Sequence, residues 1–240
     1  MEINGLTDVH CHLLPYVDDG AENLTEAKRL LALQVEQGVE TVFLTVHLRH
    51  HMFETPQQEA EMQFAKFCRE TEGEFGKLKL ILGRENHCDR IYLDNLEKGI
   101  LPTMGDSRYV LMEFHQHSSD DLRYFVKKTI EAGYKPIVAH MERYPAIERH
   151  PELAEELSDM GAMLQMNAEG LLGEMGGRYK KRCWKIMKTG IIDLVASDSH
   201  HIGFREPNLG DCAAVLRKKL SDSEYQRIMF DNPRRIVEDK

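Results

Sequence analysis

Thr7-Asp8-Val9-His10-Cys11-His12-Leu13-Leu14 is the stretch that decides the fold, and it continues through Pro15-Tyr16-Val17 into Asp18-Asp19-Gly20. Apolar and polar residues alternate here, which is typical of a β-strand. Residues two apart lie on the same face of a strand, so His10 and His12 are expected to point the same way. Two such imidazoles form half of a metal site, but a first strand with two hydrogen-bonded histidines would give the same pattern.

Six further apolar runs follow this strand, and segments with helical periodicity separate them. The expected strands are residues 40–46, 79–83, 108–112, 135–139, 162–166 and 192–196. The first expected helix begins at Asn23 or Thr25 and ends near Gln37, and the second begins with a capping box at Thr55 and ends near Glu72. The other expected helices are residues 89–98, 119–132, 151–160, 178–188, 207–220 and 221–230, with a short segment at Pro233.

This alternation predicts a parallel α/β architecture with right-handed crossovers. A closed or nearly closed barrel is favoured over an open sheet, because almost every strand ends in a polar residue. A barrel brings all the carboxyl ends of its strands to one face, whereas an open sheet has only a crevice at its switch point. The length of 240 residues fits one domain, residues 1–240.

The strand ends supply a set of imidazoles and carboxylates. Each residue alone could be a hydrogen-bonded histidine, a helix N-terminal acid or a solvated rim residue. Together they would be unfavourable on one rim unless cations neutralised them. The set is His10, His12, His47, Glu85, Glu113, His140, Asp198 and His200, with Asp18 or Asp19 nearby.

About eight ligands exceed one tetrahedral site, so two or three divalent ions are expected. Mixed imidazole and carboxylate ligands suit manganese, iron or zinc better than calcium. Arg143 and Arg205 follow the ligands His140 and His200 closely, and a guanidinium matches phosphate oxygens in a bidentate fork. Surface salt bridges to neighbouring glutamates would explain these arginines equally well from spacing alone. Beside a multinuclear metal centre, the arginines favour phosphate-ester hydrolysis.

Composition excludes several other classes. The formal net charge is −9, with 40 acidic and 31 basic residues and no block of basic residues expected anywhere, so nucleic-acid binding and membrane-surface binding by bulk charge are not expected. The sequence has no secretory signal pattern and no apolar run of membrane-spanning length, which predicts a cytoplasmic protein without membrane insertion. None of the five cysteines is followed six residues later by arginine, so no cysteine-phosphatase loop is present. The cysteines are scattered and are expected to be reduced, mostly buried thiols.

Several motifs together resemble the bacterial manganese-dependent protein-tyrosine phosphatases of the polymerase-and-histidinol-phosphatase (PHP) superfamily, the CpsB/YwqE type of capsule and exopolysaccharide synthesis. The resemblance is collinear from about residue 7 to residue 237. The motifs are His10-Cys11-His12-Leu13-Leu14-Pro15, Asp18-Asp19-Gly20, Met52-Phe53-Glu54-Thr55-Pro56, Gly105-Asp106-Ser107-Arg108-Tyr109, Met112-Glu113-Phe114, His140-Met141-Glu142-Arg143-Tyr144, Ala196-Ser197-Asp198-Ser199-His200 and Asp231-Asn232-Pro233.

The resemblance implies a distorted seven-stranded (β/α)7 TIM-like barrel of the PHP fold with a trinuclear site for Mn²⁺, for which Fe, Zn, Co or Mg could substitute. It makes Arg143 and Arg205 the phosphate-binding residues. One ion would be held by His10, His12, Glu85 and Asp198, a second by His47, Glu113 and His140 with Glu85 shared, and a third by His200 with Asp18 or Asp19.

The sequence departs from the family pattern around the second strand. The family usually has a polar residue or proline before the histidine of this strand and a basic residue after it, whereas Val46 and Leu48 flank His47 here. The sequence also carries extra histidines. These are His50, His51, His115, His117 and His201.

We therefore expect a phosphomonoesterase in which a metal-bridging hydroxide attacks phosphorus, with Arg143 and Arg205 stabilising the equatorial oxygens and His200 or a metal-bound water as candidate acid. The substrate implied by the resemblance is phosphotyrosine on a protein, a bacterial tyrosine autokinase. The alternatives are a small-molecule phosphatase of the histidinol-phosphatase kind, a phosphodiesterase, and a metal-binding regulatory protein without turnover.

Overall fold

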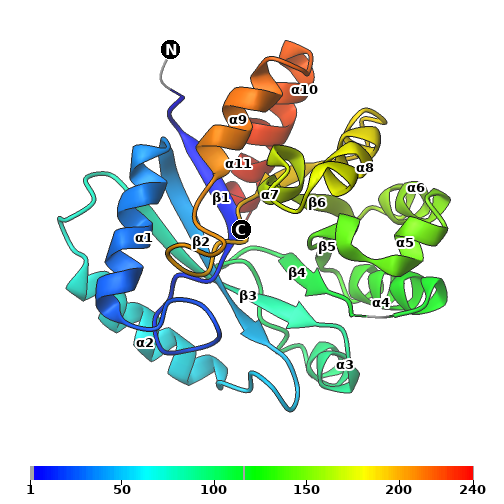
Figure 1. Cartoon of the computed structure of the whole chain (residues 1–240). Coiled ribbons are helices and arrows are strands. Elements are labelled where there is room, and N and C mark those ends of the chain that lie inside the picture. Colours follow the sequence, from blue (N-terminus) through cyan, green and yellow to red (C-terminus); the bar gives the residue numbers. More distant parts are fainter. Residues whose placement is uncertain (1–2, 116, 240) are drawn as a thin grey trace.

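The computed structural model describes residues 3–115 and 117–239, and its strands form one sheet of seven in chain order, all neighbouring pairs parallel. Figure 1 shows the helices around the outside of these strands. The strands are β1 (Leu6–Cys11), β2 (Val39–Leu48), β3 (Lys79–His87), β4 (Tyr109–Glu113), β5 (Lys135–Val138), β6 (Met163–Asn167) and β7 (Leu194–Ala196).

The first and last strands meet, which makes the barrel nearly closed. Asp198 N donates to His10 O at 2.8 Å, and His12 N donates to Ser199 O at 2.8 Å. Asp8, on β1, is fully buried at this seam and accepts hydrogen bonds from Ser197 N at 3.0 Å and from Ser197 Oγ. The predicted seven-stranded barrel is confirmed.

Two apolar clusters hold the barrel together. The inner one includes Val9, Phe43, Leu111 and Ile137, which come from β1, β2, β4 and β5, and the larger outer one fills the space between sheet and helices. Cys11 belongs to the outer cluster, and all five cysteines are free thiols. Both observations agree with the sequence-based expectation.

The predicted long helices are present with ends that differ by a few residues. The helices on the first half of the chain are α1 (Leu24–Glu36), α2 (Gln57–Glu70), α3 (Arg90–Glu97) and α4 (Ser119–Glu131). The second half contains α5 (Pro145–Arg149), α6 (Glu152–Asp159), α7 (Ala168–Leu172), α8 (Gly177–Met187), α9 (Leu209–Arg217), α10 (Asp222–Gln226) and α11 (Asn232–Glu238), with a 3-10 turn η1 (Met141–Arg143) and a π-helical turn η2 (Arg227–Asp231). None of the described helices is long and apolar enough to cross a bilayer.

The predicted capping box at Thr55 is wrong. The residue that precedes α2 is Pro56, and no side chain caps this helix. Thr55 Oγ1 instead donates to Val17 O at 3.1 Å, which ties the loop after β1 to the loop after β2. At α1, in contrast, the Asn23 side chain accepts from Glu26 N, so Asn23 rather than Thr25 is the cap.

Register along the strands sets the positions of the polar residues. β3 continues beyond the predicted end to His87, and the parallel register pairs His47 with Glu85 and His87 with Glu113. Residues paired across neighbouring strands lie about 5 Å apart, so their side chains share one end of the barrel. The register of β1 against β2 shifts between Asp8 and Cys11, next to His10.

Candidate metal centre

His10 and His12 share two buried carboxylates at the carboxyl end of the barrel. His10 Nε2 lies 3.4 Å from Glu85 Oε1 and 3.5 Å from Asp198 Oδ1. His12 Nε2 lies 3.5 Å from Glu85 Oε2 and 3.5 Å from the same Asp198 oxygen. β1, β3 and the loop after β7 thus contribute to one four-residue group, the group that the first predicted ion requires.

A second group forms on the other side of Glu85. His140 Nε2 lies 2.8 Å from Glu85 Oε1, and His47 Nδ1 lies 2.9 Å from Glu85 Oε2. Glu113 offers an oxygen to the same space as His47 and Glu85. The side chains predicted for the second ion are therefore brought together, with Glu85 between the two groups.

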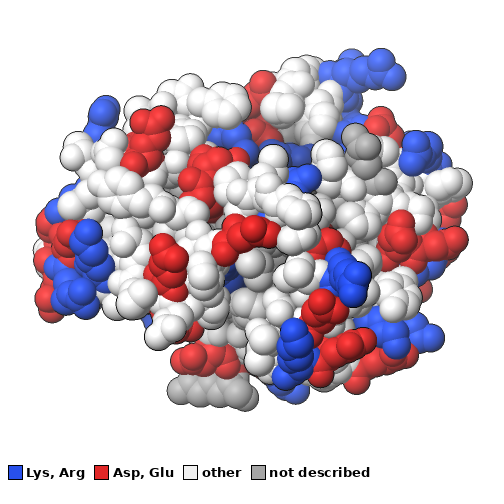
Figure 2. Space-filling view, turned by 90° about the horizontal axis from the view of Figure 1, so that it is seen from below, with Lys and Arg blue, Asp and Glu red and all other residues white. Residues whose placement is uncertain are grey.

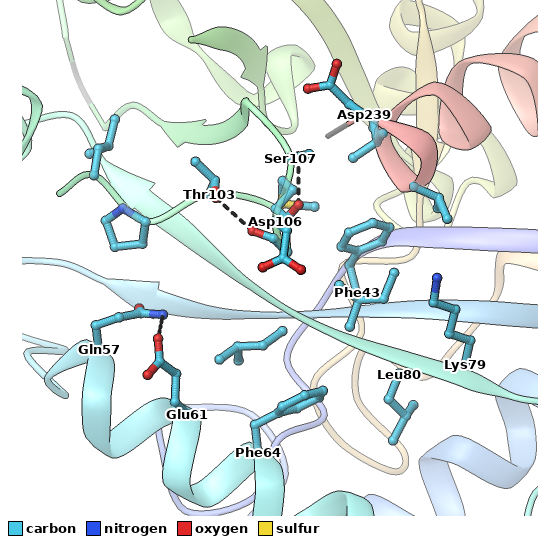
Figure 3. Close-up of a pocket in the computed structure, with 18 of the residues that line it drawn as sticks. Phe43, Gln57, Glu61, Phe64, Lys79, Leu80, Thr103, Asp106, Ser107 and Asp239 are labelled. Carbon is cyan, nitrogen blue, oxygen red and sulfur yellow. Dashed lines mark hydrogen bonds between the residues drawn. The ribbon is translucent and has the colours of Figure 1, made fainter. Parts of the chain in front are cut away.

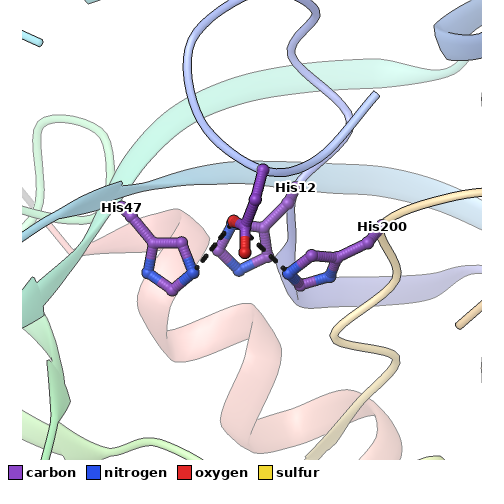
Figure 4. A group of neighbouring side chains, drawn as sticks. His12, His47 and His200 are labelled. Atoms are coloured by element: carbon purple, nitrogen blue, oxygen red, sulfur yellow. Dashed lines mark ion pairs between the residues drawn. The ribbon is translucent and has the colours of Figure 1, made fainter. Parts of the chain in front are cut away.

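A third group joins His12, His47, His200 and Asp19. Figure 4 shows the three imidazole rings converging from separate segments of the chain. Asp19 Oδ1 lies 3.4 Å from His47 Nε2 and 3.8 Å from His200 Nε2. Asp18 is occupied differently, because its carboxylate contacts His12 Nδ1 at 2.8 Å and accepts from His47 N at 2.9 Å. The geometry thus separates the two aspartates that the sequence left as alternatives.

Several groups orient the imidazoles from behind, and sequence reasoning did not assign this role to Gln165 or Tyr144. Gln165 Oε1 lies 3.1 Å from His10 Nδ1 and accepts from His140 N at 2.7 Å. Tyr144 OH lies 3.2 Å from His140 Nδ1, and Asp198 O lies 2.9 Å from His200 Nδ1. Each contact leaves Nε2 turned toward the centre, as in histidines that bind metals. The signal for Gln165 was its presence in a buried apolar strand.

The backbone is strained at three residues of the site. His140, Asp198 and Arg205 all have positive φ, at 31°, 52° and 59°. A left-handed conformation of a residue other than glycine costs of order 1–3 kcal/mol and persists where the surroundings enforce it. Strain therefore coincides with the residues that deliver side chains to the centre.

The electrostatics of the cluster fit bound cations. Burial lowers the pKa of His10, but Glu85 and Asp198 outweigh it and raise the pKa to about 9. The pKa of Glu85 stays well below its usual range despite burial, because His10 and His47 face it. His47 Nδ1 and Glu85 Oε2 are buried without a hydrogen bond. Each of these two atoms has a lone pair that points toward the other. A cation bound between them would accept both lone pairs, taking the place of a proton on the histidine.

Both predicted arginines reach the centre. Arg143 NH1 lies 3.1 Å from Asp198 Oδ2, and Arg205 forms an ion pair with the same oxygen. Arg205 Nε is buried and has no hydrogen-bond partner. The alternative of surface salt bridges to Glu142 and Glu206 does not describe the contacts seen here. Arg143 instead pairs with Glu169, a residue that sequence reasoning missed.

A cavity of about 180 Å³ opens onto these groups. Its lining includes Asp19, His47, Glu85, Glu113, His140, Arg143, Asp198, His200 and Arg205, together with Arg49, Met52 and Phe53 from the loop after β2. Phe53 stacks on the His47 ring, with centroids 5.0 Å apart and planes 12° apart.

A larger cavity of about 700 Å³ lies beside α2, against the amino half of β3 and Phe43 of β2 (Figure 3). Its lining includes Phe64, Lys79 and Asp106 but no histidine. It is therefore separate from the centre. The face of the molecule in Figure 2 carries acidic and basic side chains intermingled, with no block of one sign.

None of the extra histidines, all of them among the described residues, belongs to the three groups of the centre, and two of them contact residues distant in the sequence. His117 Nε2 contacts Cys88 O at 2.7 Å, and His201 Nδ1 lies 3.3 Å from Glu26 Oε1. His87, which sequence reasoning did not single out, lies 3.1 Å from Glu113 Oε2 and is a potential orienting group. Its signal was the polar extension of the third strand.

Comparisons with known proteins agree with this arrangement. A family model described as capsular polysaccharide synthesis, CpsB/CapC, matches residues 6–238. The tyrosine-protein phosphatase CpsB of Streptococcus pneumoniae is 33% identical over 98% of this chain and 99% of its own length. The tyrosine-protein phosphatase YwqE of Bacillus subtilis is 26% identical over 95% of this chain and 89% of its own.

A solved structure agrees as well. It comes from work on YwqE from Bacillus subtilis and CpsB from Streptococcus pneumoniae, described as unique metal-dependent tyrosine phosphatases. It superposes with a TM-score of 0.89 at 25% identity and covers 98% of this chain and 95% of that chain.

Proposed function

Because the chain belongs to the CpsB/CapC family of capsular polysaccharide synthesis, we propose that it is a metal-dependent protein-tyrosine phosphatase that acts in capsule or exopolysaccharide synthesis. Its relatives in Streptococcus pneumoniae and Bacillus subtilis bear the name tyrosine-protein phosphatase. The observation that carries the proposal is a buried set of imidazoles and carboxylates around Glu85, with two arginines on Asp198 beside it.

We propose Mn²⁺ as the metal, with two or three ions, and Fe, Zn, Co or Mg as substitutes, since the donors are a mixture of imidazole and carboxylate. His10, His12, Glu85 and Asp198 would hold one ion, and His47, Glu113, His140 and the shared Glu85 a second. A third would be held by His200 and Asp19, with Asp18 orienting His12. Bound there, the ions would neutralise phosphoryl oxygens and lower the pKa of a water molecule.

The residues of the chain supply binding and orientation. Arg143 and Arg205 would bind the phosphoryl oxygens in exchange for part of their contact with Asp198, and the unpartnered Arg205 Nε provides one donor for this. His200 acts as a ligand rather than an acid. Its Nδ1 is engaged by Asp198 O, and burial and the nearby His12 lower the pKa of His200 to about 2. A phenolate leaving group, whose ordinary pKa is about 10, needs less help from an acid than an alkoxide does.

The mouth of the cavity suits an aryl phosphate on a polypeptide. Met52 and Phe53 line the cavity, and Met52 is 60% exposed. A volume of about 180 Å³ admits a phosphoryl group and leaves the rest of a large substrate at the surface. Apolar side chains at such an opening favour a tyrosyl ring over a small polar metabolite.

We propose a bacterial tyrosine autokinase as the phosphoprotein substrate, and we propose that residues 1–240 form a single PHP-type domain. A cytoplasmic location is proposed because the five cysteines are free, which suits a reducing compartment.

The test compares kcat/KM on a phosphotyrosyl peptide with kcat/KM on histidinol phosphate, using the Mn²⁺-loaded protein. A higher value for the peptide is expected, whereas a higher value for histidinol phosphate would support the small-molecule alternative. His140→Ala should lose metal and activity together, and the exposed His150→Ala is the matched control. A metal-loaded protein that hydrolyses neither substrate nor p-nitrophenyl phosphate would contradict the proposal.

A further inference from the structure

His50, His51 and Glu54 form a cluster of metal-ligating side chains outside the centre described above. One potential ligand atom from each lies within 4.8 Å of the others, and all three residues are exposed. The two histidines are departures from the family motifs. We propose that these three side chains bind one divalent transition-metal ion at the surface, at the tip of the loop between β2 and α2.

The loop backbone is shaped so that neighbouring side chains meet. Arg49 N donates to Phe53 O at 2.9 Å and Phe53 N donates to Arg49 O at 2.8 Å, which closes a tight hairpin around His50 and His51. The side chains of adjacent residues point to opposite sides in an extended chain. His50 and His51 do not, because the chain turns at His51, which has a positive φ of 63°. The two rings therefore lie close together, with centroids 3.7 Å apart.

Glu54 completes the cluster from the other side. Its Oε1 accepts from His51 N at 3.0 Å and also contacts His50 Nδ1. This anchors the carboxylate beside both imidazoles. The side chains of His50 and Glu54 are 43% and 56% exposed, so they can rotate to close on an ion with little repacking. Ligands at about 2.1 Å from a tetrahedral ion lie about 3.4 Å apart, within reach of such rotations.

The chemistry of the donors selects the class of ion. Two imidazoles and one carboxylate suit Zn²⁺, Ni²⁺ or Cu²⁺, whereas Ca²⁺ and Mg²⁺ prefer oxygen ligands. Water would fill the remaining position. This donor set is richer in nitrogen than the group around Glu113, and it is open to solvent rather than buried.

An ion at this place would act on the wall of the catalytic cavity. The same loop lines that 180 Å³ cavity through Arg49, Met52 and Phe53. Phe53 also stacks on His47. Fixing the loop tip would restrict these side chains. An influence on substrate binding rests on the proposed function, whereas binding of the ion does not.

The first experiment counts Zn²⁺ bound by the untagged full chain in titration calorimetry. The wild type should bind one ion more than His51→Ala, irrespective of how many the buried centre takes up. The control is His150→Ala, which removes an exposed histidine paired with Glu152 and should match the wild type. Equal stoichiometry and affinity for the wild type and His51→Ala would overturn the proposal. His50→Ala, whose backbone is not left-handed, gives the same test if His51→Ala fails to fold.

The second experiment uses an immobilised Ni²⁺ chelate, which the buried centre cannot reach. The untagged wild type and His150→Ala should be retained, and His50→Ala and His51→Ala should elute earlier. Glu54→Gln should weaken Zn²⁺ binding by at least about tenfold, because even groups that only orient a ligand contribute about 10- to 100-fold. Unchanged retention of both histidine variants, or unchanged affinity of Glu54→Gln, would overturn the three-ligand site.

Discussion

Gln165 is the strongest test of how the barrel prepares the metal centre, because one amide supports two histidines. Its Oε1 accepts from His140 N at 2.7 Å and lies 3.1 Å from His10 Nδ1, while its Nε2 donates to Asn167 Oδ1 at 2.8 Å. Gln165→Leu keeps the approximate size of the side chain and removes the acceptor. Both donors would then be buried without a partner.

The expected magnitudes follow from these contacts. Each buried donor left unpaired costs about 1–3 kcal/mol, so the free energy of unfolding of the metal-free protein should fall by about 2–6 kcal/mol. Loss of a group that orients a metal-binding histidine should lower metal affinity by about 10- to 100-fold. Both effects come from one substitution that removes none of the proposed ligands.

Calorimetric titration with Mn²⁺ measures the metal affinity. Urea unfolding of the chelator-treated protein measures the free energy of unfolding. Met166→Leu is the matched control, because Met166 is the neighbouring strand residue and packs in the outer apolar cluster. Met166→Leu should lower the free energy of unfolding by less than about 1.5 kcal/mol and leave the metal affinity unchanged. A Gln165→Leu protein that binds Mn²⁺ as tightly as the wild type would refute the reasoning.

Three further predictions concern the centre itself. Asp19→Asn should lower the number of bound ions measured by elemental analysis, whereas Asp18→Asn should retain that number at reduced affinity; the reverse order would contradict the assignment. Arg143→Ala should keep its metal content and lose about 10²–10³-fold in kcat on p-nitrophenyl phosphate, as expected for loss of one group that stabilises transition-state charge; wild-type kcat would exclude that role. The pKa of His10 is raised from an ordinary 6.5 to about 9 by its ion pairs. These ion pairs therefore stabilise the metal-free protein fully below pH 6.5, and their contribution is lost as the pH rises to about 9. Urea unfolding should therefore show chelator-treated protein weakening over that range, and Mn²⁺ uptake below pH 9 should release protons in calorimetry with buffers of different ionisation enthalpy; flat stability and no proton release would contradict this.

The strand ends were predictable because buried parallel strands are short apolar runs and the polar residue that follows each run is conspicuous. This placed His47, Glu113 and His140 correctly at one end of the barrel. The short helices α5 and α7 were missed, because five residues are too few to show a helical period. The capping box at Thr55 failed because a tertiary contact with Val17 took the hydroxyl.

Other features depend on contacts that no local pattern encodes. The different partners of Asp18 and Asp19 arise from the path of the loop after β1, and Gln165 is defined only by the histidines it meets across the sheet. A cluster of lysines was also missed, because Lys219 joins the others from a distant part of the sequence. These lysines line a surface hollow beside α8. Its lining residues are Lys180, Lys181, Trp184, Lys185, Lys188 and Lys219.

The central claim is that phosphotyrosine hydrolysis depends on ions held by the group around Glu85. The most direct measurement strips the protein with chelator and then titrates Mn²⁺ while turnover of a phosphotyrosyl peptide and ions bound per chain are followed together. Turnover should be absent at the start, rise with bound metal and level off at two or three ions per chain. Turnover that persists in the stripped protein under strong chelator would contradict the account.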